Sequence, residues 1–284
     1  MLNAAGFREA KRITRKYAKT FYFASFFLTK GRRYAAYAVY AICRLSDESV
    51  DGNSSGSPSD RLKLIEENIA SAYANGGLNS PLLKSFRQTV LEYGIPKTYF
   101  DVLVSGMRLD LEKSRYRDFN QLKDYCYRAA GVVGLIMLKI FGCKDSRAEE
   151  YAEDLGTAMQ LTNIIRDIKE DWERKRLYLP LDELSKFGVS EQGLDNRRCD
   201  ENFKALLKFQ ISRARDYYQK SSPGIRLIAD ARSRFTVLTI KELYAKILEQ
   251  MEAQGYDVFK HRARVSTFKK LVCFTGIILK GRYL

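Results

Sequence analysis

Apolar residues recur every three or four positions along most of this 284-residue chain, and this repeat constrains the fold more than any other feature. A clear stretch carries Leu62, Ile65, Ile69 and Tyr73, which fall on one side of a helix. No stretch alternates apolar and polar residues between hairpin turns, and the 5 prolines mostly lie between the periodic segments. The sequence therefore predicts an all-α protein of about eight to ten helices. We find no linker, so residues 1–284 are expected to form a single domain.

The charge is concentrated at the two ends. Residues 1–33 carry nine Lys/Arg and one acidic residue, residues 255–284 carry seven and one, and the whole chain has a net charge of +15. Such ends attract anions, whether nucleic acid, anionic lipid or a diphosphate. The single histidine, His261, excludes a multi-histidine zinc site, and 5 scattered cysteines without a CxxC pair are typical of a reducing compartment. The start lacks a signal-peptide core, and the apolar runs reach about half the ~20 residues of a membrane span, so we expect a cytoplasmic protein.

The first segment that carries candidate functional residues is a helix expected over Tyr37 to Asp51. Tyr37, Tyr40, Arg44, Asp47 and Asp51 follow one another at spacings of three or four and share one face, while the other positions are largely apolar. Two carboxylates one turn apart repel each other unless a cation is near. Mg²⁺ suits them, because it takes hard oxygen ligands together with substrate phosphates. Taken alone, the pair is more often a solvated acidic face.

A second polar stripe is expected on a helix over Tyr151 to Trp172. Its members are Gly156, Gln160, Asn163, Asp167 and Asp171. It too ends in paired carboxylates, and apolar residues adjoin it. Two such helices facing each other predict a site for two or three Mg²⁺ ions around a diphosphate, with Mn²⁺ as an alternative ion.

Other segments are less specific. Asp110 lies beside a cluster of basic residues, which also fits an exposed charged helix. Gly131 and Gly134 lower helix stability and indicate close approach by another helix or by an apolar ligand. The chain has 18 Tyr and 16 Phe, which are mostly expected in the core, although a cavity that shields a carbocation also needs aromatic faces.

Together the segments resemble the squalene/phytoene synthase family, over about residues 19–270. The motifs that carry the resemblance stand in the expected order: Tyr40–Arg44, Asp47–Asp51, Gly106–Tyr116, Tyr125–Gly134, Gln160–Asp171 and Arg176–Pro180. The resemblance implies a helical isoprenoid-synthase bundle with a central cavity. It also implies head-to-head condensation of two prenyl diphosphates through a cyclopropylcarbinyl diphosphate.

The resemblance also implies roles for single residues. As Mg²⁺ ligands it implies Asp47, Asp51, Asn163, Asp167 and Asp171, the four aspartates being catalytic together with Tyr125, which would lie near the reacting carbons. For substrate binding it implies Tyr40, Arg44, Asp110, Asn163, Arg166, Tyr244, Arg262, Phe21 and Ser25. Two positions depart from the family pattern: Ala129 replaces a usual Val, and Glu48 replaces a common Asp.

Among family members, the motifs around Asp47 and Asp110 look most like phytoene synthases, which join two C20 geranylgeranyl diphosphates without NADPH. A small Ser25 on the helix expected to line the prenyl pocket would leave depth for a C20 chain. The alternatives are a C30 enzyme that uses farnesyl diphosphate and a non-catalytic scaffold protein. A nucleic-acid-binding protein would leave both acidic stripes unexplained. The basic ends and the run Leu271–Leu279 either rest on an anionic membrane or pack into the bundle.

Overall fold

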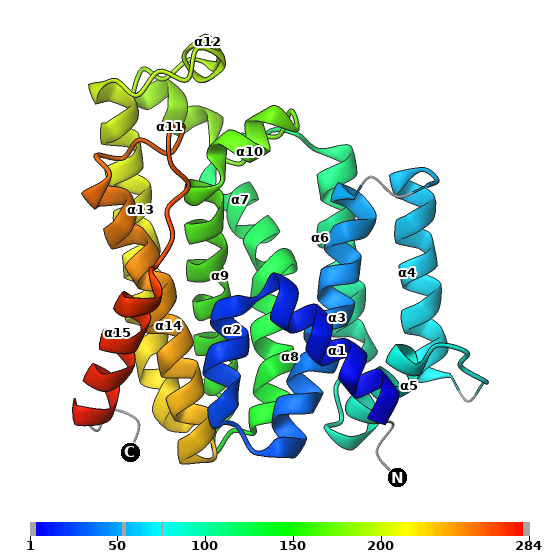
Figure 1. Ribbon diagram of the computed structural model, residues 1–284. Helices are drawn as coiled ribbons and strands as arrows, with labels where there is room; N and C mark the ends of the chain where they lie inside the picture. Colours follow the sequence, from blue (N-terminus) through cyan, green and yellow to red (C-terminus); the bar gives the residue numbers. More distant parts are fainter. Residues whose placement is uncertain (1–3, 53–54, 75, 281–284) are drawn as a thin grey trace.

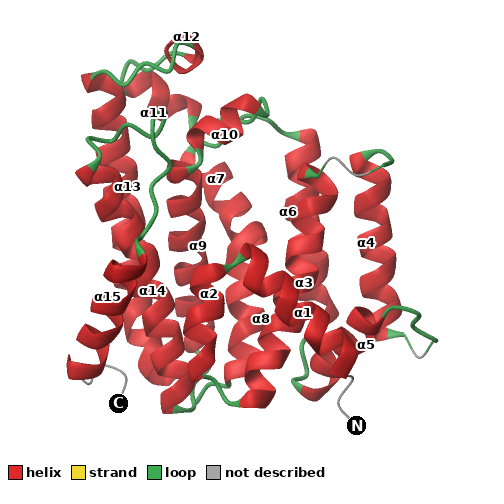
Figure 2. Ribbon diagram, viewed as in Figure 1, coloured by secondary structure: helices red, strands yellow, loops and turns green. Residues whose placement is uncertain are grey.

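The computed structural model describes residues 4–52, 55–74 and 76–280, and these are helical nearly throughout (Figure 2). The segments, labelled in part in Figure 1, are α1 (Ala4–Tyr17), α2 (Lys19–Ala24), η1 (Ser25–Phe27), α3 (Lys30–Asp51), α4 (Pro58–Tyr73), α5 (Pro81–Glu92), α6 (Lys97–Glu112), α7 (Phe119–Cys126), η2 (Tyr127–Gly131), α8 (Val132–Phe141), α9 (Ala148–Arg166), α10 (Ile168–Glu173), α11 (Leu181–Lys186), α12 (Glu191–Asp195), α13 (Glu201–Ser221), η3 (Ser222–Leu227), α14 (Ala231–Ala253) and α15 (Thr267–Lys280).

The all-α prediction is confirmed: within the described ranges only two isolated β-bridges occur and no strand forms. The segments are more numerous than expected because several are short. α2, α10 and α11 have 6 residues each and α12 has 5, and such pieces escape a search for long periodic runs.

Polar side chains start many of the helices. In each case the side-chain oxygen accepts a hydrogen bond from a backbone N–H of the first turn; these N-caps are Ser57, Ser80, Asp118, Ser190, Asp200 and Asp230. Pro58 and Pro81 take the first helical position of α4 and α5, where the missing N–H removes no bond. The prolines therefore lie at helix starts, as their spacing indicated.

Helix α9 runs through the middle of the bundle and contacts α7, α8, α13, α14, the π-helical segment η2 and the 3₁₀ helix η3 (Figure 1). Its approach to α8 and to η2 is close because two glycines allow it. A Cβ on Gly134 would come within 2.3 Å of the Ala152 carbonyl oxygen, and one on Gly156 within 2.4 Å of the Ala130 carbonyl oxygen. Of the two readings left open for Gly134, close helix packing is confirmed.

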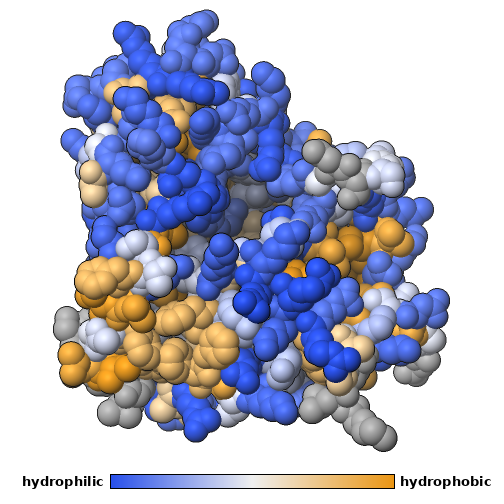
Figure 3. Space-filling model, viewed as in Figure 1, coloured by the Kyte–Doolittle hydropathy of each residue, from blue (hydrophilic) through white to orange (hydrophobic). Residues whose placement is uncertain are grey.

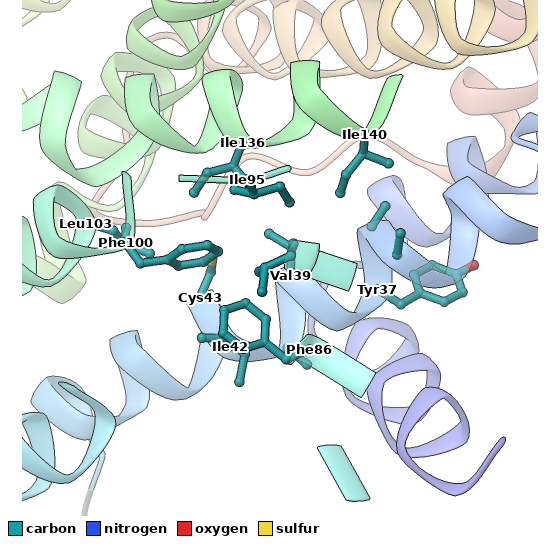
Figure 4. Close-up of a cluster of buried hydrophobic side chains, with 14 of the residues drawn as sticks. Tyr37, Val39, Ile42, Cys43, Phe86, Ile95, Phe100, Leu103, Ile136 and Ile140 are labelled. Carbon is teal, nitrogen blue, oxygen red and sulfur yellow. The ribbon is translucent and has the colours of Figure 1, made fainter. Parts of the chain in front are cut away.

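Buried side chains form two large clusters on either side of α9. The first lies among α1, α3, α5, α6 and α8, and Figure 4 shows Val39, Ile42 and Cys43 of α3 meeting Phe86 and Phe100. The rings of Phe86 and Phe100 meet edge to face at 4.9 Å. The second cluster joins α7, α13 and the outer side of α9. Between these clusters the bundle holds a cavity.

Candidate active site

The cavity has a volume of about 720 Å³ and is walled mainly by α3, α6, α8, α9 and α14. Its two ends differ in chemistry. The carboxyl-terminal halves of α3 and α9 supply carboxylates and arginines, whereas the end of α8 and the start of α9 supply apolar side chains such as Met137, Phe141 and Ala148. A long apolar pocket closed by a charged end suits a ligand with a charged head and a hydrocarbon tail.

The first predicted stripe lies on a single helix, α3. Tyr40, Arg44, Asp47 and Asp51 line the cavity, as their spacing predicted. Tyr37, one turn earlier, does not line it: the ring is 1% exposed and packs among the aromatic side chains of α2. The stripe therefore reaches the cavity only from Tyr40 onward.

The placement of Ser25 differs from the prediction. Phe21 lines the cavity, but Ser25 does not, and its hydroxyl donates to the Tyr22 carbonyl at 2.7 Å and lies 2.7 Å from the Tyr37 hydroxyl. The reason is local: α2 ends at Ala24, and the chain tightens there into the 3₁₀ turn η1, which directs Ser25 toward α3. The small side chain accommodates the Tyr37 ring, so the expectation that it sets pocket depth is wrong in this geometry.

The second predicted stripe also lines the cavity, but its helix is not continuous. Gly156, Gln160 and Asn163 lie on α9, which ends at Arg166, and α10 begins at Ile168. Asp167 stands at the break with φ −104° and ψ 15°. Asp167 and Asp171 still both face the cavity, opposite the aspartates of α3.

Burial sets the electrostatics of the carboxylates. Desolvation, together with nearby carboxylates, raises the pKa of Asp47 to about 7 and that of Asp171 to about 8. Asp110 is buried as well, and its pKa rises to about 6 although two tyrosines donate to it. Ionisation of the carboxyl groups at this end of the cavity is therefore disfavoured unless a cation is near.

Arginines hold the other aspartate of each pair. Burial opposes ionisation of Asp167, but Arg166 and Arg262 outweigh it and lower the pKa. Both guanidinium groups bond both carboxylate oxygens, Arg262 at 2.7 and 2.9 Å and Arg166 at 2.7 and 2.5 Å. Asp51 accepts a hydrogen bond of 2.6 Å from Arg176. The arrangement joins carboxylates that attract metal ions to cations that attract phosphate.

The donor set fits a hard divalent cation. Asp47 and Asp171 have no ion pair within the described part of the chain, and the buried Asn163 Oδ1 accepts no hydrogen bond. Among the same residues, no three His, Cys, Asp or Glu side chains come close enough to hold an ion unaided. Each ion would therefore complete its shell with water or with phosphate oxygens, as Mg²⁺ commonly does.

All the other predicted site residues line this cavity. These are Asp110, Tyr125, Asn163, Arg166, Tyr244 and Arg262. Tyr125 donates to Asp110 Oδ2 at 3.1 Å. Tyr244 comes from α14, where its hydroxyl lies near Arg166 and Asp167. Ser25 is thus the only predicted site residue that the structure places outside the lining.

Sequence reasoning gave no role to Arg176 and Tyr178, which both line the cavity. Tyr178 donates to Asp110 Oδ1 at 2.7 Å and lies 3.3 Å from the Tyr125 hydroxyl, and Arg176 bonds Asp51. They belong to an extended segment held by an isolated bridge from Leu177 to Arg115, so alternate side chains point to the cavity. A period of two over Arg176–Pro180 was the available signal.

Comparisons with known proteins agree with one another. The family model for squalene/phytoene synthase matches residues 14–269. The phytoene synthase of Arthrospira platensis is 37% identical over 288 residues, covering 96% of this chain and 93% of its own. The 15-cis-phytoene synthase of Synechococcus elongatus is 36% identical over 291 residues, covering 98% of this chain and 94% of its own.

Solved structures show the same architecture. A dehydrosqualene synthase solved with a ligand superposes with a TM-score of 0.91 at 26% identity, covering 99% of this chain and 98% of its own. A squalene synthase from Alicyclobacillus acidocaldarius superposes with a TM-score of 0.82, also at 26% identity, covering 89% of this chain and 95% of its own.

Proposed function

The chain belongs to the squalene/phytoene synthase family, and we propose that it joins two molecules of geranylgeranyl diphosphate head to head to give phytoene, in carotenoid biosynthesis. It is a prenyltransferase-type enzyme. The observation that carries the proposal is the cavity in which two facing acidic pairs and five arginines close one end of a long apolar pocket. The phytoene synthases noted above share more than a third of its residues over nearly the whole chain.

The charged end would bind both diphosphates. Asp47, Asp51, Asn163, Asp167 and Asp171 would hold two or three Mg²⁺ ions, which supply the charge neutralisation that lets a diphosphate leave. Arg44, Arg166 and Arg262 would bind phosphate oxygens directly, with Tyr40 and Tyr244 donating beside them. Asp110 and Tyr178 would hold Tyr125 against the reacting carbons.

The apolar part of the cavity would control the fate of the cation. In the first half-reaction an allylic C–O bond breaks, the double bond of the second substrate attacks the cation, and one proton leaves to form the cyclopropane. In the second, the remaining C–O bond breaks, the skeleton rearranges, and a second proton leaves. No reductant is consumed. Side chains such as Met137, Leu138 and Ile228 exclude water that would otherwise capture the cation.

The test is product analysis. Purified protein is incubated with Mg²⁺ and either geranylgeranyl or farnesyl diphosphate, with and without NADPH, and the extracted hydrocarbon is identified by mass. We expect a C40 product from geranylgeranyl diphosphate without NADPH. A C30 product would keep the chemistry but move the enzyme to the farnesyl branch. No product from either substrate, with the helical content intact, would favour the scaffold alternative.

We also propose that the protein works at a membrane surface without crossing it. Both the substrate tails and the proposed product are hydrocarbons. The basic ends of the chain would therefore bind anionic lipid headgroups rather than nucleic acid. None of the described helices combines the length and the apolar composition that crossing a bilayer requires. The cytoplasmic location stays a prediction.

A further inference from the structure

Helix α15 carries apolar side chains on two opposite sides. Its inner side packs into the bundle, where the Phe274 ring lies 4.9 Å from Phe27 and 5.5 Å from Phe235. Cys273 and Ile277 are buried beside it. Its outer side is formed by Phe268 and by the residues 3, 4, 10 and 11 positions after it, which fall on the same side of a helix: Leu271, Val272, Ile278 and Leu279. We call these five residues the α15 outer face.

The α15 outer face is exposed to a degree that is unusual for such residues. Phe268 is 74% exposed and Leu279 86%, and Phe26 in the neighbouring turn η1 is 51% exposed. Exposed large apolar side chains elsewhere in the described residues stand singly on their elements, for example Leu64 on α4 and Leu91 on α5. Figure 3 shows the apolar surface as one orange region at the lower left, over α15 and the adjoining lower end of α2. A contiguous patch of this kind marks a binding surface.

Cations surround this surface. Lys269 is exposed beside the α15 outer face, whereas Lys270 lies on the inner side of α15, where burial and the positive charge of Lys19 on α2 lower its pKa. Arg33 stacks over Phe26, with its guanidinium carbon 5.6 Å from the ring centre. Helix α15 contains no acidic residue. Lys269 and Arg33 therefore place positive charge at the edge of the apolar side chains.

Helix α1 lies on the same side of the molecule as α2 and α15 (Figure 1) and carries further cations. Its exposed cations form no ion pair with any described residue; they are Arg8, Arg12, Arg15 and Lys16. A second copy of this chain would bring two such cationic rims together, which opposes association. An anionic bilayer neutralises the rim and accepts the apolar face at once.

We propose that the α15 outer face and Phe26 insert into the interfacial layer of an anionic bilayer, while the cations of α1 bind its headgroups. Only α2 and α14 separate this surface from the cavity: Phe21 and Val237 line the cavity, and Phe23 and Phe235 contact α15. The docking surface follows from its own residues. Only the use of this surface rests on the proposed function: docking there would let the enzyme exchange hydrocarbon substrates and product with the membrane over a short distance.

The test is flotation with vesicles of phosphatidylcholine, with or without phosphatidylglycerol, at low and high salt. We expect binding to the anionic vesicles that high salt weakens. The double variant L271S/L279S should bind about tenfold more weakly, since two exposed leucines no longer insert. Its matched control is L64S/L91S, which alters two exposed leucines on α4 and α5 and should bind as wild type.

The contribution of charge is tested with the variant R12Q/R15Q. Its control is K63Q/K208Q, which changes two exposed lysines on α4 and α13. Losing two cations of α1 should weaken binding to anionic vesicles about tenfold or more and leave binding to neutral vesicles unchanged. Equal binding by L271S/L279S and wild type, or no wild-type binding at low salt, would overturn the proposal. So would a change of oligomeric state in L271S/L279S measured by sedimentation velocity, because a second copy would then cover the face.

Melting temperatures and turnover of detergent-dispersed substrate complete the experiment. Both variants should melt as wild type does, and turnover in detergent should be unchanged because neither pair of residues lines the cavity. Vesicle binding without any turnover of either diphosphate would uphold the docking surface while rejecting the proposed function. Turnover without vesicle binding would do the reverse.

Discussion

The two acidic pairs share one spacing and are built differently. Asp47 and Asp51 lie on the unbroken helix α3, whereas Asp167 stands at a break and Asp171 follows on α10. In the first pair the later aspartate is bound to arginine, through Arg176, and the earlier one is free of ion pairs within the described residues. In the second pair the earlier aspartate, Asp167, is bound by arginines, and the later one, Asp171, has no ion pair with any described residue.

The difference teaches how one helical spacing supplies both kinds of group that a diphosphate site needs. In each pair, burial raises the pKa of the aspartate without an arginine, and that carboxylate gains most from a divalent cation. The other aspartate orients guanidinium groups at the edge of the cavity. Aspartates with and without an arginine partner therefore alternate around the cavity, and their order along the chain is opposite in the two pairs.

The largest effect should come from neutralising the aspartates that have no arginine. We expect Asp47→Asn and Asp171→Asn each to lower kcat/KM about 10³-fold or more, because each removes a charged ligand from the cation site. Both variants should nevertheless melt at a higher temperature than wild type in EDTA, since they relieve buried repulsion. Activity assays and thermal melts check this. Asp101→Asn, at an exposed position of α6, is the control. A lower melting temperature in EDTA would contradict our account.

A second comparison concerns Arg262 and Arg176, whose replacement should affect activity and stability differently. Arg262→Met should lower kcat/KM by about 10²-fold, mostly through KM, with little loss of stability because Arg166 still holds Asp167. Arg176→Met should also lower the free energy of unfolding, by about 2 kcal/mol, since it leaves the buried Asp110 with less positive charge and removes the ion pair of the partly exposed Asp51. The side chains differ accordingly, Arg176 being 13% exposed and Arg262 39%. Steady-state kinetics and denaturant titrations would measure both, and equal stability losses would contradict the distinction.

The sequence predicted the parts of the site that depend on helical spacing. Every residue assigned from the two stripes except Tyr37 reaches the cavity, because positions three and four apart share a helix face wherever the helix continues. Apart from Tyr37, which lies inside α3, the errors lie where a helix stops. A 3₁₀ turn carries Ser25 away from the cavity, and an extended segment brings in Arg176 and Tyr178. Such changes depend on tertiary packing, which periodicity does not encode.

Removing the metal should expose the charge that both pairs share. The folded-state pKa values of Asp47 and Asp171 are raised to about 7 and about 8, above the value of 3.8 expected for an unfolded chain. Their contribution to stability is therefore full below about pH 4 and is lost as the pH rises through 7 and 8. In EDTA we expect the free energy of unfolding to fall by several kcal/mol between about pH 5 and pH 8. Mg²⁺ should restore it, and in D47N/D171N the slope should flatten. An unchanged slope in that double variant would show that other groups cause it.

The smallest effect should come from the hydrogen bonds beside the first acidic pair, which have no counterpart at the second pair. The side of the cavity near Asp51 also has Asp110, which accepts hydrogen bonds from Tyr178 at 2.7 Å and from Tyr125 at 3.1 Å. Tyr178→Phe removes the shorter bond, so Tyr125 loses a fixed partner and the pKa of Asp110 rises further. We expect kcat to fall about tenfold and the acidic limb of its pH profile to move to higher pH, with KM little changed.

Tyr116→Phe is the matched control for that change. The Tyr116 ring stacks on Tyr178 at 5.7 Å and is equally buried, but its hydroxyl has no hydrogen-bond partner among the described residues. Removing an unsatisfied buried hydroxyl should leave kcat unchanged and keep or raise the melting temperature. If Tyr178→Phe leaves kcat unchanged as well, the ring stack, which both variants keep, positions Tyr125 rather than the bond to Asp110. In that case the first acidic pair depends on packing, whereas the second depends on the arginines that clamp Asp167.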